Sequence, residues 1–269
     1  MKVSKKVAGV EYAIRDIVSA AREIEKQGKT VDYLNIGDPV QFGFQPPENV
    51  KRALINAVND GNNFYTQSEG LPELLDAIAK KENSKGLSIS SEHVIVTNGV
   101  SEGLDMIISS IVEDGDEVLL PGPYYPPYAS YVRLHGGKPI EFEVDLETSQ
   151  PNIDDLKSKI SSKTVGICLI TPNNPTGMIF NEKSLKEIVD IANEHDLYII
   201  CDEIYDKIVF DEKFTGIGKV SGDAPVILLN GFSKVHLMSG WRIGYIVFND
   251  SPKLDSIREN LPKDRKSVV

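Results

Sequence analysis

Lys234 is the side chain whose type and position most directly suggest chemistry. It comes shortly after the apolar run 226–229, where a sheet strand is expected to end. A lysine in such a place is either held in an ion pair or left as a reactive amine, and a desolvated lysine is the residue type that forms Schiff bases. Eight residues later, Arg242 offers a planar guanidinium group that suits a phosphate. These residues alone leave both interpretations of Lys234 open.

A carboxylate occupies the corresponding place after another apolar run. Asp202 directly follows Leu197–Cys201 and is itself followed by Glu203 and Tyr205. Burying a carboxylate at the tip of an apolar strand is costly unless the carboxylate meets a cation or several hydrogen-bond donors. We therefore favour a functional role for Asp202 over a purely structural one.

A turn of small and polar residues, 98–103, separates the apolar run 94–97 from a helical pattern that begins near Leu104. Backbone N–H groups and the hydroxyl of Ser101 at the start of a helix favour an anion, most often a phosphate. The alternative is that Ser101 merely caps the helix. The sequence has neither a P-loop nor a Gly-x-Gly-x-x-Gly motif, so the common nucleotide-binding signatures are absent.

Two proline-rich loops follow two other apolar runs. The loop 121–128 places Tyr124 beside Tyr125, either as part of a rigid turn or as a surface on which a planar ring could stack. The loop 172–177 holds Asn174 directly before a proline, which would fix the direction of its amide, although many such turns have no function. Neither loop decides between its two interpretations by itself.

The apolar runs before these residues predict the fold that positions them. They are short and mostly continuous, as expected of strands buried on both faces, and helical periodicity lies between some of them. Such an alternation predicts an α/β fold with a mostly parallel sheet and helices on both faces. Ligands of such sheets bind beyond the carboxyl ends of the strands, which is where the residues above are located. The predicted strands are 94–96, 117–120, 165–170, 197–201, 226–229 and 243–248.

Both ends of the chain depart from this alternation. Residues 12–27 predict an amphipathic helix that Gly28 stops, and a short apolar run follows at 31–36. The last twenty residues contain only a weak helical pattern. We expect three parts, namely an N-terminal segment of a small domain (1–45), a large ligand-binding domain (46–250) and the start of a C-terminal segment (251–269).

Composition narrows the classes of function. A formal charge of −11 argues against a nucleic-acid or anionic membrane surface, and no apolar run approaches the roughly 20 residues that span a bilayer. The N-terminus leads into charged sequence and not into the apolar stretch of a signal peptide. Cys168 and Cys201 lie within apolar runs and predict buried thiols, which favours a cytoplasmic protein. The four histidines lack metal-ligand spacing, so we predict no metal site.

Taken together and in this order, the segments resemble the class I and II aminotransferases of fold type I, which depend on pyridoxal 5′-phosphate (PLP). The resemblance extends from residues 35–39 to residues 240–245 and is greatest for the aspartate, alanine and aromatic amino acid aminotransferases. It implies the large domain of that fold with an incomplete small domain. Its activity would exchange an amino group between an L-amino acid (alanine, aspartate, glutamate or aromatic) and a 2-oxo acid. The motifs are weak singly and specific in combination: Asn174-Pro175-Thr176-Gly177, Asp202-Glu203-x-Tyr205, and Ser233-Lys234 with Arg242.

The resemblance also implies a role for each matched residue. Lys234 would bind PLP as a Schiff base and later move the proton between the substrate α-carbon and the cofactor. Asp202 would keep the pyridine nitrogen protonated, which makes the ring an electron sink. Asn174 and Tyr205 would hydrogen-bond the ring oxygen, and Tyr125 would stack on the ring face.

The remaining matched residues concern the phosphate and the substrate. Gly37 would lie near the substrate carboxylate, with Asn174 on the same side of the site. Tyr65 matches a tyrosine that reaches the phosphate of a neighbouring subunit, which implies a homodimer. The phosphate itself would be held by the backbone N–H of Val100 and by the side chains of Ser101, Ser233 and Arg242.

One element of the resemblance has no match in this sequence. Family members carry a C-terminal part whose arginine grips the substrate α-carboxylate, and Arg258 and Arg265 lie too close to the large domain to be assigned that role. Such a clamp contributes both orientation and binding. Besides an active aminotransferase, the sequence therefore leaves a catalytically weak or silent PLP-binding fragment, or a PLP-dependent C–S lyase on the same scaffold.

Overall fold

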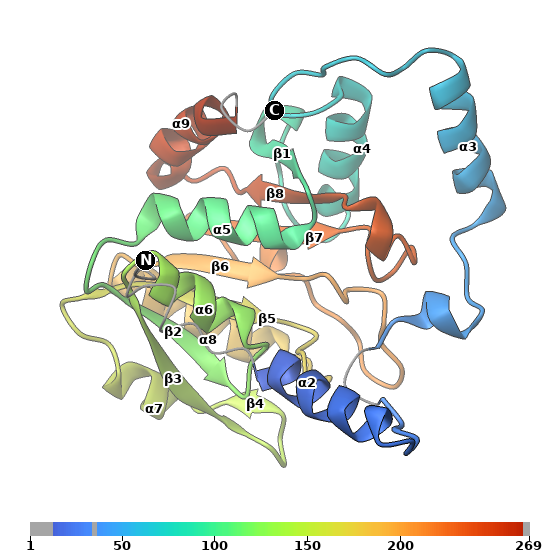
Figure 1. Cartoon of the computed structure of the whole chain (residues 1–269). Coiled ribbons are helices and arrows are strands. Elements are labelled where there is room, and N and C mark those ends of the chain that lie inside the picture. The colour runs from blue at the N-terminus through green and yellow to red at the C-terminus, as the bar shows by residue number, and fades with distance from the viewer. Residues whose placement is uncertain (1–12, 34–36, 266–269) are drawn as a thin grey trace, which may run out of the picture.

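The computed structural model, which describes residues 13–33 and 37–265, is built around one mixed sheet (Figure 1). Its eight strands lie in the order β1-β8-β7-β6-β5-β2-β3-β4. Five neighbouring strands, from β7 to β3, run parallel, and β8 is antiparallel to both of its neighbours. The strands are β1 (Val94–Thr97), β2 (Glu117–Gly122), β3 (Lys138–Asp145), β4 (Gln150–Pro151), β5 (Thr164–Ile170), β6 (Tyr198–Asp202), β7 (Val226–Gly231) and β8 (Gly244–Phe248).

Helices cover both faces of this sheet. One apolar core lies between the sheet and α4, α7 and α8, and a second lies between the sheet and α5, α6 and α9 (Figure 1). Side chains from the same strands enter both cores, because successive residues of a strand point to opposite faces. The helices are α2 (Ala13–Lys26), α3 (Glu48–Asn59), α4 (Pro72–Asn83), α5 (Val100–Ile111), α6 (Pro127–Leu134), α7 (Ile153–Ser158), α8 (Glu182–Glu194) and α9 (Asp255–Arg265).

Burial of whole strands explains why the sequence reveals them. Every residue of β7 and β8 is buried, and Leu228 enters one core while Leu229 enters the other. Complete burial of a leucine contributes about 1.5–3 kcal/mol, so two-sided burial strongly favours continuous apolar runs. The predicted α/β fold with helices on both faces of a mostly parallel sheet is confirmed.

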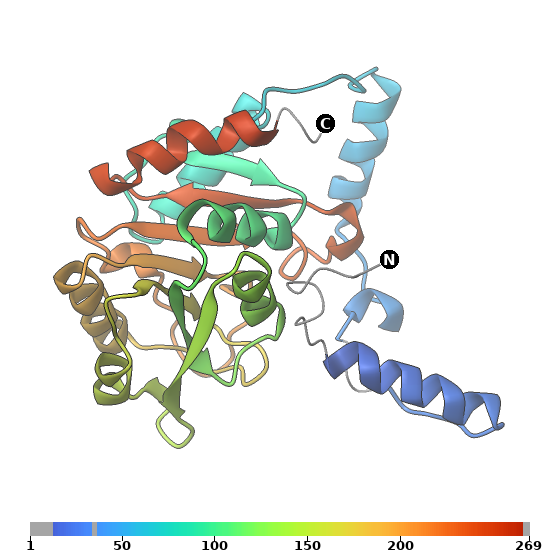
Figure 2. The same cartoon turned by 60° about the vertical axis from the view of Figure 1, so that its left-hand side comes forward.

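The N-terminal part lies beside this assembly. The helix expected over 12–27 is present as α2, but residues 31–33 form no strand, and residues 34–36 of the same run lie outside the described residues. Figure 2 shows α2 and α3 standing away from the sheet and its covering helices. No residue of α3 is buried, whereas α9 at the other end packs on the sheet through Leu261. The division into three parts stays a prediction.

Topology brings the chemically interesting residues to one edge of the sheet. Because β8 is antiparallel to β7 and to β1, the carboxyl ends of β1, β2, β5, β6 and β7 all lie at the same edge. Within residues 13–33 and 37–265, no helix has the length and hydropathy needed to span a membrane, and no group of His, Cys, Asp and Glu could hold a metal ion.

Candidate active site

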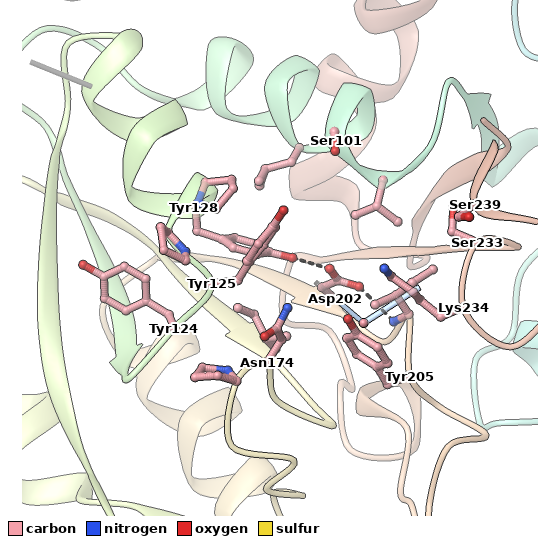
Figure 3. A pocket seen from close by; sticks show the side chains of 18 of the residues that line it. Ser101, Tyr124, Tyr125, Tyr128, Asn174, Asp202, Tyr205, Ser233, Lys234 and Ser239 are labelled. Carbon is pink, nitrogen blue, oxygen red and sulfur yellow. Dashed lines mark hydrogen bonds between the residues drawn. The ribbon is translucent and has the colours of Figure 1, made fainter. Parts of the chain in front are cut away.

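A cleft of about 1260 Å³ opens at the carboxyl edge of the sheet (Figure 3). Tyr65 does not line it and is 83% exposed. The N-terminal helix α2 adds Val18, Ser19 and Arg22 to the wall. The cleft brings together the other residues singled out from the sequence, namely Gly37, Val100, Ser101, Tyr125, Asn174, Asp202, Tyr205, Ser233, Lys234 and Arg242.

Asp202 is the last residue of β6 and is only 4% exposed. Its Oδ1 accepts a hydrogen bond from the backbone N–H of Ile204 at 2.8 Å, and its Oδ2 accepts one from the hydroxyl of Tyr128. Burial raises the pKa of Asp202 to about 6, although both hydrogen bonds and the positive charge of Lys234 act in the opposite direction. The carboxylate is therefore mostly charged at neutral pH, in a place where a protonated ligand nitrogen would stabilise it.

Sequence reasoning missed Tyr128. This residue lies in the first turn of α6, is fully surrounded by protein, and points its hydroxyl at Asp202 (Figure 3). Burial and the negative charge of Asp202 raise the pKa of Tyr128 well above its ordinary value, so the hydroxyl stays protonated and donates. The available signal was the need of a buried carboxylate for donors, together with a third tyrosine in the loop already noted for Tyr125.

Lys234 enters the cleft from the loop after β7, the strand that pairs with β6. Its backbone carbonyl accepts a hydrogen bond from the N–H of Leu237, which turns the chain back at this point. Figure 3 shows the Lys234 and Asp202 side chains pointing into the same space. In the part of the chain that the structure describes, Lys234 has no carboxylate within ion-pair distance. This geometry favours an available amine over a structural ion pair.

Asn174 and Tyr205 both line the cleft. Burial and the negative charge of Asp202 raise the pKa of Tyr205, and the Asn174 side chain partly offsets this increase. The loop that carries Asn174 is held from within, because Asn173 Oδ1 accepts hydrogen bonds from the N–H and the hydroxyl of Thr176 at 3.2 and 3.0 Å. The two polar groups are therefore presented together, as the sequence led us to expect.

Tyr125 forms one side of the cleft. Its ring meets the ring of Tyr128 edge to face, with 6.3 Å between the centroids and an angle of 71°. Because Tyr128 is buried, this contact helps to fix the orientation of the Tyr125 ring. A planar ligand next to Asp202 would have this aromatic side chain beside it.

The start of α5 forms the other end of the cleft, and the alternative in which Ser101 caps the helix is wrong. Gly99 holds the cap position with a φ of 79°, while Ser101 lies in the first turn with its side chain exposed to the cleft. Its hydroxyl is therefore available to an anion, together with the free N–H groups of the helix start.

Arg242 packs against this helix start. Its guanidinium donates to the backbone carbonyls of Ser239 at 2.9 Å and Asn98 at 3.2 Å. A Cβ on Gly99 would come within 2.5 Å of the guanidinium, and a Cβ on Gly244 would come within 2.5 Å of the Gly99 backbone. Glycine at both positions permits this approach, which places a positive charge beside the N–H groups of α5.

Three hydroxyl groups surround the same end of the cleft. Ser101 and Ser233 were expected there, whereas Ser239 was not. Figure 3 shows Ser239 next to Ser233. Hydroxyls, helix N–H groups and a guanidinium together form the donor set typical of a phosphate site. The sequence offered only a weak signal for Ser239, since an isolated serine near a turn is common.

A family model described as aminotransferase class I and II matches residues 30–266. Over 250 residues, the chain is 38% identical to the glutamate-pyruvate aminotransferase AlaA of Haemophilus influenzae, a match that covers 91% of this chain and 62% of that protein. Over 251 residues, it is 36% identical to the (5-formylfuran-3-yl)methyl phosphate transaminase of Methanocaldococcus jannaschii, covering 92% and 64%. The chain thus spans less than two thirds of the length of these curated relatives.

Solved structures show the same likeness. The alanine aminotransferase from Pyrococcus furiosus superposes with a TM-score of 0.96 at 45% identity, which covers 99% of this chain and 69% of that one. A double mutant of the aspartate aminotransferase of Thermus thermophilus has a TM-score of 0.90 at 30% identity, which covers 99% of this chain and 68% of that one. These similarities confirm the fold type I large domain predicted for the chain.

Proposed function

Because the chain belongs to the class I and II aminotransferase family, we propose that it binds PLP and transfers an amino group from an L-amino acid to a 2-oxo acid. One observation carries the proposal: Lys234 and Asp202 point into one cleft, with no ion pair of Lys234 among the described residues. An amine and a buried carboxylate in this arrangement are what a PLP enzyme needs.

The donor groups of the cleft fit PLP along its whole length. One end of the cleft suits the phosphate, because it combines the guanidinium of Arg242, three hydroxyl groups and the start of α5. The backbones of Gly99 and Gly244 lie close together there, so that a phosphate could reach backbone N–H groups. At the other end, the buried Asp202 suits a protonated pyridine nitrogen. Between them lie the aromatic face of Tyr125 and the amine of Lys234.

Each side chain then has a definite task. Asp202 would hold the proton on the ring nitrogen of bound PLP, and the hydrogen bond from Tyr128 favours the charged form of Asp202 that this task requires. Asn174 and Tyr205 would donate to the oxygen on the ring and so orient the cofactor. When bound, PLP supplies an electron sink for the charge left on the substrate α-carbon.

Lys234 has two tasks in succession. Its amine would link the aldehyde of bound PLP to the protein and, when free, would take the proton from the substrate α-carbon and return it. Its position supports this use, because Lys234 lines the same cleft as Asp202 and has no carboxylate within ion-pair distance in the described part of the chain. Substrate would approach from the side of Gly37 and Asn174, which also line the cleft.

We propose L-glutamate and pyruvate as the first substrates to test, since the names of the relatives above include glutamate-pyruvate and alanine aminotransferases. We further propose a cytoplasmic homodimer. The 83% exposed Tyr65, which does not line its own cleft, supports a role at the site of a second copy.

The experiment is a coupled assay of the purified protein with PLP, L-glutamate and pyruvate, in which L-alanine and 2-oxoglutarate are quantified. The parent protein should form both products in equal amounts, and Lys234→Ala should form neither although it still binds PLP through its phosphate. Equal rates with and without Lys234 would contradict the proposal. For the dimer, Lys234→Ala and Tyr65→Phe proteins are mixed, and recovered activity indicates sites shared between subunits.

A further inference from the structure

A buried cluster of charged and polar side chains lies behind the cleft, on the face of the sheet that α4 covers. Its carboxylates are inaccessible to solvent, with Glu82 and Glu203 at 0% exposure and Asp206 at 5%. Nothing in the proposed chemistry uses these residues. We call them the α4 charge cluster, which consists of Lys81, Glu82, Lys85, Glu203, Asp206, Asn230 and Tyr245.

Two lysines form ion pairs with the three carboxylates of this cluster. Lys85 Nζ lies 2.5 Å from Glu82 Oε2, 2.7 Å from Glu203 Oε2 and 3.0 Å from Asp206 Oδ2. Lys81 Nζ lies 3.1 Å from the same oxygen of Asp206 and 3.3 Å from Glu82 Oε1. Buried ion pairs of this kind cost desolvation energy and are weak as a source of stability, so their presence suggests a role in fixing geometry.

Asp206 is the residue on which the contacts converge. Its Oδ2 accepts hydrogen bonds from Lys81, Lys85 and the side-chain amide of Asn230, the last at 3.0 Å. Asp206 directly follows Tyr205, whose hydroxyl group lies in the cleft. The Oδ1 of Asn230 accepts from the N–H of Gly231 at 2.7 Å, at the start of the segment that leads to Lys234.

This carboxylate therefore joins the two segments whose relative position decides the site. One continues from β6, whose last residue is Asp202, and carries Tyr205, and the other continues from β7 and carries Lys234. The Asp206–Asn230 contact is a direct side-chain tie between the first segment and the end of β7, and Lys81 connects it to α4 while Lys85 connects it to the turn after α4. A displacement of about 1 Å at a reacting group can reduce a rate about 100-fold, so such a tie has functional weight.

We propose that Asp206 is a positioning residue for the cofactor site, which fixes the segment of Tyr205 against the segment of Lys234. The inference rests on the proposed function and deepens it. Asp206 does not touch the cofactor and acts only through the chain segments that it connects.

The test compares Asp206→Asn with Glu82→Gln. Both substitutions remove one buried negative charge that the same two lysines contact, but Asp206 adjoins Tyr205, whereas Glu82 adjoins no residue of the cleft. PLP affinity is measured from quenching of Trp241, the single tryptophan, which precedes Arg242. The visible absorption band of the PLP-saturated protein and urea unfolding are recorded in parallel.

Both variants should be less stable to urea. Asp206→Asn should in addition weaken PLP binding about 10- to 100-fold and shift the absorption band of the saturated protein, because Tyr205 no longer meets the ring oxygen correctly. Glu82→Gln should keep the parental band and a dissociation constant within about threefold of the parent. A merely structural role would leave the band of the folded, saturated protein unchanged in both variants.

Asn230→Ala provides a second test that keeps every charge, and circular dichroism establishes which variants fold. It should shift the band in the same direction as Asp206→Asn, and it decides the question if Asp206→Asn does not fold. A parental band and affinity in Asn230→Ala, or equal changes in Asp206→Asn and Glu82→Gln, would overturn the inference. If the parent itself binds no PLP, the proposed function fails instead.

Discussion

Replacing Asp202 by asparagine should stabilise the cofactor-free protein, because the carboxylate is suited to a ligand and not to its apolar surroundings. Burial raises the pKa of Asp202 from 3.8 to about 6. A folded-state pKa above the unfolded value means that ionisation opposes folding. The penalty is absent below pH 3.8, grows as the pH rises toward 6 and is then constant. A shift of about 2 pKa units corresponds to about 3 kcal/mol.

Asparagine is uncharged at every pH and can still accept from Tyr128 or Ile204, so it removes this penalty. Urea unfolding of the cofactor-free protein should show Asp202→Asn more stable than the parent by about 3 kcal/mol at pH 7.5 and by about half as much at pH 5. Asp155→Asn is the control with the opposite sign, because hydrogen bonding to Lys159 lowers the pKa of that half-buried carboxylate. An Asp202→Asn protein that is less stable than the parent, or whose gain is the same at both pH values, would refute the reasoning.

Three further predictions follow from the contacts of the cleft. Tyr128→Phe removes a hydrogen-bond donor from the buried carboxylate of Asp202, so the pKa of Asp202 should rise further. The PLP dissociation constant, measured by equilibrium dialysis at pH 7, should increase about 10-fold. An unchanged dissociation constant would argue against this role of Tyr128. Arg242→Lys should weaken the binding of PLP about 10-fold or more. The affinity for pyridoxal, which lacks the phosphate, should stay within about twofold of the parental value. Equal losses of affinity for both compounds would contradict the assignment of Arg242 to the phosphate. Gly244→Ala should lower the free energy of unfolding by about 1–3 kcal/mol, because the new Cβ would meet the Gly99 backbone at 2.5 Å. Gly240→Ala, with nothing within 4 Å of its Cβ, should have little effect in the same urea titration, and similar losses in both proteins would show that the contact is unimportant.

The strands that hold the site could be predicted because burial on both faces leaves little freedom of composition. β7 and β8 are buried throughout and appear in the sequence as unbroken apolar runs. β3 was not predicted. It lies toward the edge of the sheet and carries several exposed charged residues, and Phe142 is its only buried residue. α3 was not predicted either, although its sequence is amphipathic, and none of its residues is buried.

The site itself was predictable to the extent that it follows from topology. The carboxyl ends of parallel strands lie at the same edge of a sheet, so Asp202 and Lys234 could be placed near each other without any measured distance. Tyr128 and Ser239 could not, because their relevance depends on contacts across the cleft and not on their neighbours in the chain. The tie between Asp206 and Lys81 joins residues far apart in sequence, and neither residue has a local pattern that distinguishes it from surface charge.

The central claim is that the amine of Lys234 forms the covalent link to PLP. The most direct measurement is borohydride reduction of the PLP-loaded protein, followed by digestion and mass spectrometry of the labelled peptide. The account predicts a single stable pyridoxyl group on Lys234 and its loss in Lys234→Ala. A label on another lysine, or the same labelling in the absence of Lys234, would contradict it.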